Sequence, residues 1–268
     1  MSHSTSSPWV VREDAAGITT LTLNRGERFN ALSEEMLDAL LTVFKTIAQE
    51  PQVRVVVLAA AGKAFCAGHD LKQMQQHPDA SYYQQLFQKC SKLMIAIQKL
   101  PQPVIARVHG LATAAGCQLV AMCDLAVAAE NASFAVSGVN VGLFCSTPAV
   151  ALSRNVSRKQ AMEMLLTGDF IDAHTAMQRG LVNRVVANDQ LDAAVASLAA
   201  SIVRKPAVAI SMGKQLFYKQ LDMGIEAAYQ IAGQTMACNM MDASAQEGVQ
   251  AFIEKRLPDW HVGDTTRV

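Results

Sequence analysis

The sequence lacks an excess of charge of either sign, because its 268 residues carry 23 lysines and arginines against 23 aspartates and glutamates. It also contains no block of basic residues. Non-specific binding to nucleic acid or to an anionic membrane needs such a block to neutralise phosphates, so neither partner is expected. An acidic ligand must instead be held by a few local groups.

Paired cysteines, targeting signals and long apolar runs are missing as well. None of the six cysteines forms a CxxC pair, and most lie among apolar residues, as reduced and buried thiols do. The first eleven residues, MSHSTSSPWVV, are serine-rich and lack arginine, unlike a signal or transit peptide. No run of 18 apolar residues avoids charged and turn residues, so no membrane span is expected. These features predict a cytoplasmic protein.

What is present favours a large buried core, since 51% of the residues are hydrophobic and 17% are charged. Neither a linker rich in Gly, Ser or Pro nor a repeat of fixed period divides the chain. Strand-like and helical segments mix in the first part, and helical patterns dominate the last. We predict an α/β core over residues 1–200 and a helical C-terminal region over residues 201–268.

Local patterns place the elements of this α/β chain. A turn at 14–17 predicts a hairpin of strands 9–11 and 18–24, and Ser33 is a natural cap for the helix that follows it. The apolar run 54–60 is typical of a strand covered on both faces. Further strands are expected at 104–108, 125–129 and 182–186. Further helices are expected at 81–100, 158–167, 173–179, 191–204, 207–220, 225–241 and 246–256.

A loop at residues 63–72, KAFCAGHDLK, follows the expected strand 54–60. Loops at the carboxyl ends of strands often bind ligands, and Ala67 and Gly68 would let a ligand approach the backbone N–H groups. Tight packing accounts for such a turn equally well. Cys66 and His69 also suggest a thiol–imidazole pair, although a buried structural thiol and a histidine acting through its backbone fit better.

Two more loops have a composition suited to a site. Residues 109–118, HGLATAAGCQ, place small residues before a helix, which aims N–H donors at a developing negative charge. This loop is not GxGxxG, since Gly110 and Gly116 lack the middle glycine and the acidic partner, so no dinucleotide cofactor is supported. Residues 133–148 carry hydroxyls and glycines but no acid, as an ordinary loop around a core does.

Taken in order, these segments resemble the enoyl-CoA hydratase/isomerase (crotonase) family along nearly the whole chain. The motifs that carry the resemblance are LNR at 23–25, NAL at 30–32, FCAGHDLK at 65–72, GCQL at 116–119, CDLAVA at 123–128, Gly142 after Phe134, and EGVQAFIEKR at 247–256. The resemblance implies a spiral of ββα units that forms two roughly perpendicular sheets. It also implies C-terminal helices that build homotrimers or dimers of trimers.

The same resemblance implies an acyl-CoA thioester as ligand, with no cofactor beyond the coenzyme A of the substrate and no metal. The backbone N–H groups of His69 and Ala115 would polarise the thioester oxygen. Ala67, Gly68 and Leu71 would line the path of the adenine and pantetheine. Arg28, Lys72 and Lys255 would be candidates for the phosphates of coenzyme A, with Lys255 reaching a neighbouring subunit, and Phe252 would also contact coenzyme A.

The departures from the family pattern concern proton transfer. The two glutamates of the family's hydratases align with Gln118 and Gly138, and neither residue can accept a proton. Each acid–base group typically contributes about 10²–10⁴-fold, so ordinary hydration should be weak or lost. A naphthoyl-CoA synthase branch of the family also has a glycine at the second position and uses bicarbonate. In this chain Val136 replaces the glutamine that would anchor that anion.

Other carboxylates do not take over this role in the sequence. Asp70 resembles a family residue that holds its loop, and Asp124 and Glu130 flank a buried strand as surface or capping groups. Two functions therefore stay open. One is a lyase or isomerase that stabilises a thioester enolate, and the other is a non-catalytic acyl-CoA-binding or regulatory protein of fatty-acid metabolism. Helices near 74–100 would set the acyl chain length.

Overall fold

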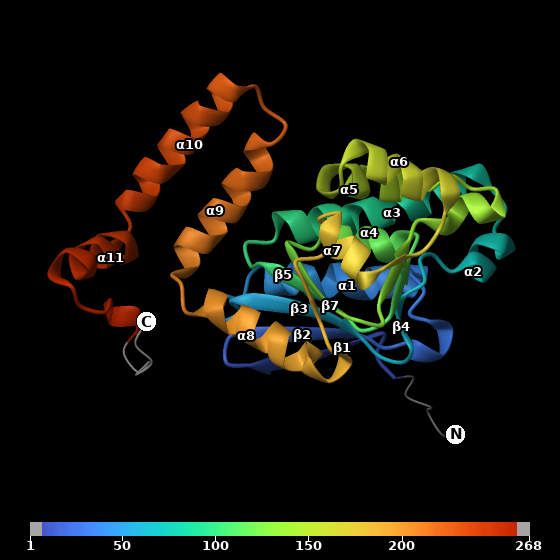
Figure 1. Ribbon diagram of the computed structural model, residues 1–268, viewed down its shortest axis with the longest axis horizontal. Helices are drawn as coiled ribbons and strands as arrows, with labels where there is room; N and C mark the ends of the chain where they lie inside the picture. Colours follow the sequence, from blue (N-terminus) through green and yellow to red (C-terminus); the bar gives the residue numbers. More distant parts are fainter. Residues whose placement is uncertain (1–6, 262–268) are drawn as a thin grey trace.

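The structure is a computed structural model that describes residues 7–261. The chain forms two β-sheets, a set of helices against them, and a C-terminal helical arm (Figure 1). The N-terminal segment compared above with targeting peptides lies mostly outside the described residues, as do the last seven residues.

The large sheet has the order β1-β2-β3-β5-β7-β10. Its first two strands form the predicted hairpin, β1 (Val10–Ala15) and β2 (Ile18–Leu23), and the remaining neighbours pair in parallel. The hairpin turn places Ala16 and Gly17 at φ of 49° and 78°, the conformation that two-residue turns require. The other strands are β3 (Val55–Ala60), β5 (Val104–Val108), β7 (Leu125–Ala129) and β10 (Arg184–Val186).

The small sheet consists of short strands that the sequence pattern did not reveal, because two or three residues carry no periodicity. Its order is β4 (Ala64–Cys66), β6 (Leu111–Thr113), β8 (Ser133–Ala135) and β9 (Ile171–Asp172). Strands β4, β6 and β8 each follow one long strand, β3, β5 and β7, and each is followed by helical structure. This repetition confirms the predicted spiral of ββα units.

The large sheet is covered on both faces, as the apolar run of β3 predicts. Alternate residues face opposite ways, so Val55 and Val57 join a cluster with α8 (Leu191–Val203). Val56 and Leu58 join the main core with α1 (Glu34–Ile47) and α3 (Ala80–Lys99). Ser33 caps α1 as predicted, accepting from the N–H of Met36 at 3.3 Å.

The remaining helices cover the small sheet or form the arm. The body holds α2 (Leu71–Gln76), α4 (Ala115–Met122), α5 (Ser146–Asn155), α6 (Arg158–Thr167) and α7 (Ala173–Gln178), with short 3₁₀ turns η1 (Gly26–Arg28), η2 (Ser137–Val141) and η3 (Asn188–Gln190). The arm holds α9 (Ala207–Gln220), α10 (Ile225–Met240), α11 (Ala243–Glu254) and η4 (Asp259–His261), and it extends away from the sheets (Figure 1).

Two further segments differ from the sequence prediction, and β1 also extends four residues beyond its predicted end at residue 11. Residues 133–148 are more than a loop, since they contain β8, η2 and the start of α5. Helix α11 begins before the predicted residue 246, because Asp242 caps it by accepting from the N–H of Ser244 at 2.8 Å. Among the described helices, none is by itself long and apolar enough to cross a membrane; one pair, 188–203 with 207–220, meets the criterion jointly but is bent by 103°.

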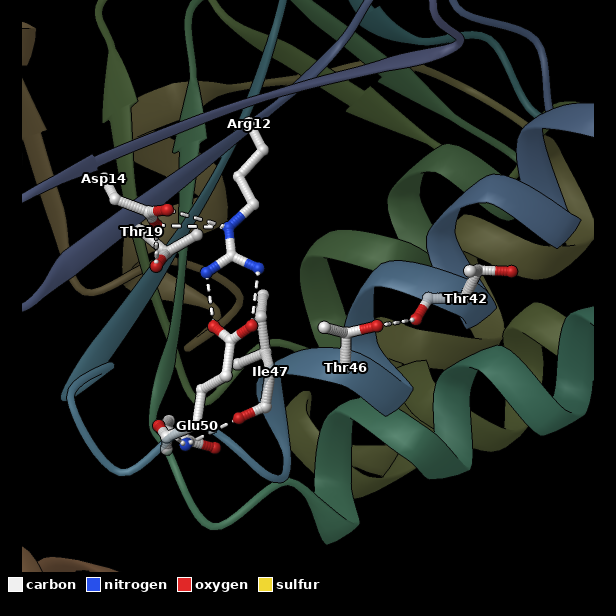
Figure 2. A network of polar contacts seen from close by, with 8 residues as sticks. Arg12, Asp14, Thr19, Thr42, Thr46, Ile47 and Glu50 are labelled. Atoms are coloured by element: carbon white, nitrogen blue, oxygen red, sulfur yellow. Dashed lines mark hydrogen bonds and ion pairs between the residues drawn. The ribbon is translucent and has the colours of Figure 1, made fainter.

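A polar network ties the hairpin to the end of α1 (Figure 2). The guanidinium of Arg12 donates to both carboxylate oxygens of Glu50 and, from Nε, to Asp14 at 3.0 Å. The hydroxyl of Thr19 donates to Asp14 at 2.5 Å, which lowers the pKa of that carboxyl. Each of the four side chains, Arg12, Asp14, Thr19 and Glu50, has a partner within the network, which indicates a structural role.

A second polar cluster fixes the arm to the body. Lys214 of α9 is buried and donates to Asp124 Oδ2 at 2.6 Å and to the carbonyls of Ile97 and Gln102. Tyr218, one turn further on, donates to Asp124 Oδ1 at 2.8 Å. The expectation that Asp124 is a surface or capping group is therefore wrong: α9 packs over this carboxylate, which sequence spacing cannot reveal.

We expect Asp124→Ala to lower the free energy of unfolding by about 3–5 kcal/mol, because it leaves the Lys214 ammonium buried without a counter-charge. Glu130→Ala is the matched control, since Asp124 directly precedes β7 whereas Glu130 directly follows it and is exposed. Its effect should stay within about 0.5 kcal/mol. Urea denaturation measures both values, and similar losses for the two variants would contradict the role given to Asp124.

Candidate functional site

A cavity of about 350 Å³ opens between the small sheet, α2, α3 and the segment before α5. Most of its wall is apolar, and the described residues that line it include no aspartate or glutamate. The large apolar side chains of the wall are Leu71, Met74, Phe87, Val141, Leu143 and Phe144. Such a wall suits an aliphatic ligand whose polar end is held by a few groups.

The polar side of the cavity is made by two loops of backbone. One follows β4 and contributes Ala67 and His69, and the other follows β6 and contributes Ala114 and Ala115. Helix α4 begins at Ala115, and no side chain caps it. The first N–H groups of a helix have no partner inside the helix and carry partial positive charge, so the N–H of Ala115 is an available donor.

The two loops are in direct backbone contact. A Cβ atom on Gly116 would lie 2.1 Å from the carbonyl oxygen of Cys66. This distance is shorter than any Cβ atom can approach without displacing the carbonyl. A Cβ on Gly68 would lie 2.9 Å from the methyl of Ala114 and 3.2 Å from the N of Ala115. The glycines therefore fix the loop after β4 against the start of α4.

The backbone at Ala114 is strained, with φ of 49° and ψ of −120°. This region favours glycine, and a residue with a Cβ costs about 1–3 kcal/mol there. Its N–H donates to the carbonyl of Ala135 at 3.0 Å, and its carbonyl accepts from the N–H of Gln118 at 3.1 Å. The strained residue is thus held from both sides directly before the first donor of α4.

His69 is half-buried, with its ring edge-on to Phe87 at 5.4 Å between centroids. Burial lowers the pKa of its imidazole to about 4, so the ring is neutral near pH 7. Its Nε2 atom is buried and has no partner among the described residues. No hydrogen bond joins the His69 ring to Cys66 among the described residues, and burial raises the pKa of that thiol to about 12.

Gln118 lies three residues after Ala115 and on the same side of α4. Its side chain is buried, with 5% of the residue exposed, and its Oε1 atom has no partner within residues 7–261. A buried acceptor without a hydrogen bond is unfavourable. The amide that stood out in the sequence is therefore also unsatisfied in the folded chain.

Gly138 has no room for a side chain. A Cβ there would lie 2.3 Å from the carbonyl oxygen of Leu143 and 2.8 Å from Cys145 Sγ. The N–H of Gly138 donates to that sulfur at 3.3 Å, and burial raises the pKa of the Cys145 thiol. Neither Gly138 nor the Cys145 thiol offers a base at neutral pH.

Several cavity residues were missed by sequence reasoning, because the third loop looked ordinary. Thr113 and Ser137 bring their hydroxyls to 2.9 Å at the edge of the cavity, although 24 residues separate them. Phe144 and Cys145 also come from this loop. Its glycines and hydroxyls were the available signal, but only the pairing of β6 with β8 brings it to the first two loops.

The remaining predicted residues lie in three places. Asp70 has the predicted structural role, since it caps α2 through the N–H groups of Lys72 and Gln73. Arg28 and Lys72 are exposed, on η1 and α2. Phe252 and Lys255 belong to the arm, at the opposite end of the molecule from α2, and do not line the cavity of their own chain (Figure 1).

A spiral of ββα units, an apolar cavity and backbone N–H donors at the start of α4 together define a ligand-binding protein of the crotonase type. The model of the family "Enoyl-CoA hydratase/isomerase" matches residues 13–263. The chain belongs to this family.

Relatives and solved structures agree with this assignment. Enoyl-CoA hydratase domain-containing protein 3 of Danio rerio is 45% identical over 255 residues, 95% of this chain and 88% of the relative. An enoyl-CoA hydratase of Mycobacterium smegmatis has a TM-score of 0.94 at 62% identity and covers 95% of this chain and all of its own. The human protein of the same name as the Danio relative, ECHDC3, has a TM-score of 0.91 at 43% identity, covering 94% of this chain and all of its own.

The expectation of a cytoplasmic protein is contradicted by these comparisons. The domain-containing relatives from Danio rerio, Mus musculus and Homo sapiens, 45–46% identical, are all named as mitochondrial. Reduced and buried thiols indicate a reducing environment but do not identify a particular compartment. The composition therefore could not distinguish the cytoplasm from another reducing compartment.

We expect Gly116→Ala to lower the free energy of unfolding by about 1–3 kcal/mol or more, because its methyl must displace the Cys66 carbonyl. Ala114→Gly should instead leave stability unchanged or raise it by about 1 kcal/mol, since relief of strain outweighs the added entropy of the unfolded chain. Urea denaturation of the two neighbouring variants tests the contact. Equal losses would show that the loops do not interlock.

Proposed function

We propose that this chain binds an acyl-CoA thioester in the cavity and polarises its carbonyl through the backbone N–H groups of His69 and Ala115. The observation that carries the proposal is the contact between the two loops, which holds the uncapped start of α4 at the wall of an apolar cavity. The family assignment supports the same ligand class.

Polarising a thioester favours chemistry at the neighbouring carbon. Loss or gain of a proton there passes through an enolate, whose oxygen carries negative charge. A fixed donor aimed at such an oxygen contributes about 3 kcal/mol to the transition state. Lyase or isomerase chemistry of this kind needs the two donors first and a proton-transfer group second.

Ordinary hydration is weak or lost in this proposal, because Gln118 and Gly138 stand at the positions of the family's two glutamates. An amide cannot accept a proton, and position 138 has no space for a side chain. Neutral His69 is a weak base, and Val136 is buried and apolar, so bicarbonate gains no anchor from it. The second candidate function, acyl-CoA binding or regulation without efficient turnover, is favoured by the same lack of a base.

Coenzyme A would lie along Ala67, Gly68 and Leu71, with Arg28 and Lys72 near its phosphates. Phe252 and Lys255 can reach it only from another copy of the chain, because the arm carries them away from the cavity of their own chain. We retain 1–200 as the core and 201–268 as the region that assembles homotrimers or dimers of trimers.

The arm supports assembly through its exposed apolar surface. On α10, four large apolar residues are separated by 4, 7 and 4 positions, so they lie along one face of the helix as a stripe. Two residues of α11 and one residue after its C-terminus add three more large apolar side chains. These exposed residues are Ile225, Tyr229, Met236, Met240, Phe252, Ile253 and Leu257. Within residues 7–261 this stripe is left exposed, and a second copy of the arm would offer a surface of the same apolar character.

Wild-type protein should hydrate crotonyl-CoA slowly, and Gln118→Glu should raise the rate by about 10²-fold by restoring one acid–base group. Gly138→Glu cannot serve as a companion, because the Leu143 carbonyl occupies its place. The loss of absorbance of the enoyl thioester measures the rate, with and without bicarbonate. Rapid hydration by wild-type protein in the absence of bicarbonate would refute the loss of hydratase function.

Tyr229→Glu should shift the protein from an oligomer toward monomers, because it places a charge in the apolar stripe of α10. Gln230→Glu is the matched control, since it adds the same charge at the next exposed position. Light scattering after size exclusion gives both masses. A monomeric wild-type protein, or equal effects of the two variants, would count against assembly through the arm.

A further inference from the structure

The sulfur of Cys145 lies in the space that a side chain at position 138 would need. A Cβ atom on Gly138 would lie 2.8 Å from Cys145 Sγ, and the N–H of Gly138 donates to this sulfur at 3.3 Å. Both residues line the cavity, although Cys145 is only 7% exposed. A thiol therefore forms part of the cavity wall at the point where residue 138 cannot carry a side chain.

This sulfur lies close to the start of α4. Burial, and then the neighbouring Cys145, raise the pKa of Cys117 to about 12, so the two thiols lie near one another. Cys117 is the third residue of α4, which begins at the cavity donor Ala115. The strand that leads to this part of the wall, β8, is tied to the same place, because the N–H of Ala114 donates to the carbonyl of Ala135 at 3.0 Å. A ligand held by the N–H of Ala115 is therefore within reach of the Cys145 sulfur.

A buried nitrogen without a partner belongs to the same cavity wall. His69 Nε2 is buried and has no hydrogen-bond partner within residues 7–261. An unpaired buried polar atom is unfavourable. Its place in this wall, beside the Cys145 thiol, indicates that a ligand fills the cavity.

Cys145 is the strongest nucleophile among the described residues that line the cavity. The hydroxyls of Ser137 and Ser146 lie on the same wall, but they are bonded to the Thr113 hydroxyl at 2.9 Å and to the Phe144 carbonyl at 3.3 Å. A hydroxyl also needs a base beside it to attack, and no carboxylate lines this part of the described chain. A thiol needs no such partner, since a small fraction of it is thiolate near neutral pH.

We infer that Cys145 is a covalent modification site for α,β-unsaturated acyl-CoA thioesters. The inference rests on the proposed acyl-CoA site and extends it to a reaction with the protein. The N–H donors that polarise the thioester oxygen also draw electrons from a conjugated double bond, which makes the third carbon, counted from the carbonyl, open to attack by the thiolate.

The reaction is a conjugate addition that needs no oxidant or reductant. A carbon–sulfur bond forms at the third carbon, and the electron pair of the double bond moves to the thioester oxygen as an enolate. The second carbon then takes up a proton from solvent, which replaces the proton that the thiol released. The product carries the whole thioester, coenzyme A included. Burial raises the pKa of the Cys145 thiol, and the N–H of Gly138 lowers it by a smaller amount, so the addition is slow and stoichiometric.

Intact-protein mass spectrometry after incubation with crotonyl-CoA tests the inference. The wild-type chain should gain one adduct with the mass of the whole thioester, and peptide mapping should place it on Cys145. Cys145→Ser should abolish the adduct, and its hydroxyl can still accept from the N–H of Gly138. Cys238→Ser is the matched control, since Cys238 is the exposed cysteine of the described chain, and it should leave the yield unchanged.

Butyryl-CoA supplies a second measurement on the wild-type chain. It has no double bond, so it should give no adduct, and an excess of it should slow the labelling by crotonyl-CoA because both esters occupy one cavity. This comparison does not depend on the folding of a variant.

The outcomes separate the two proposals. If the chain binds butyryl-CoA in calorimetry but crotonyl-CoA gives no adduct, the Cys145 inference is wrong and the acyl-CoA site stands. If neither ester binds to a chain that is folded by circular dichroism, the acyl-CoA site itself is wrong. A gain of the acyl mass alone overturns conjugate addition, because the thiol must then have attacked the carbonyl and released coenzyme A. Labelling that persists in Cys145→Ser, or that excess butyryl-CoA does not slow, overturns the assignment to this cavity.

Discussion

The contact between Gly116 and the Cys66 carbonyl is the constraint on which the site depends. Two loops from different ββα units meet there without a side chain between them. Their backbone groups therefore keep a fixed separation that no rotamer change can alter. The cavity, the start of α4 and the position of Gln118 all follow from this contact, and the strain at Ala114 is the conformational cost of the same arrangement.

The same local geometry separates binding from proton transfer. Backbone donors need only small residues and a helix start, and both are present. Acid–base catalysis needs a titratable side chain with its pKa near the working pH. Among the described residues that line the cavity there is no carboxylate, burial keeps His69 neutral, and Gly138 is crowded by Leu143. In the proposed function, backbone donors that suit a thioester are therefore present without a carboxylate beside them among the described cavity residues.

The arm depends on a different constraint. Lys214 and Tyr218 converge on Asp124, which also accepts from the N–H of Val104 at 2.7 Å. One carboxylate therefore joins α9 to the N-terminal ends of the interior strands β5 and β7. Burial lowers the pKa of Lys214, and the charge of Asp124 opposes that shift. The rest of the described arm extends away from the sheets, and its apolar stripe is exposed.

The sequence by itself determined the long strands, most helix boundaries and the family, because periodicity, caps and ordered motifs are local signals. It also singled out Gln118 and Gly138. Tertiary structure alone decided which loops meet, since β6 pairs with β8 across 22 residues and brings Ser137 to Thr113. It alone showed that Asp124 is an anchor, that position 138 is closed to a side chain and that the Gln118 oxygen has no partner among residues 7–261. These facts depend on contacts between distant segments, and a pattern along one segment does not contain them.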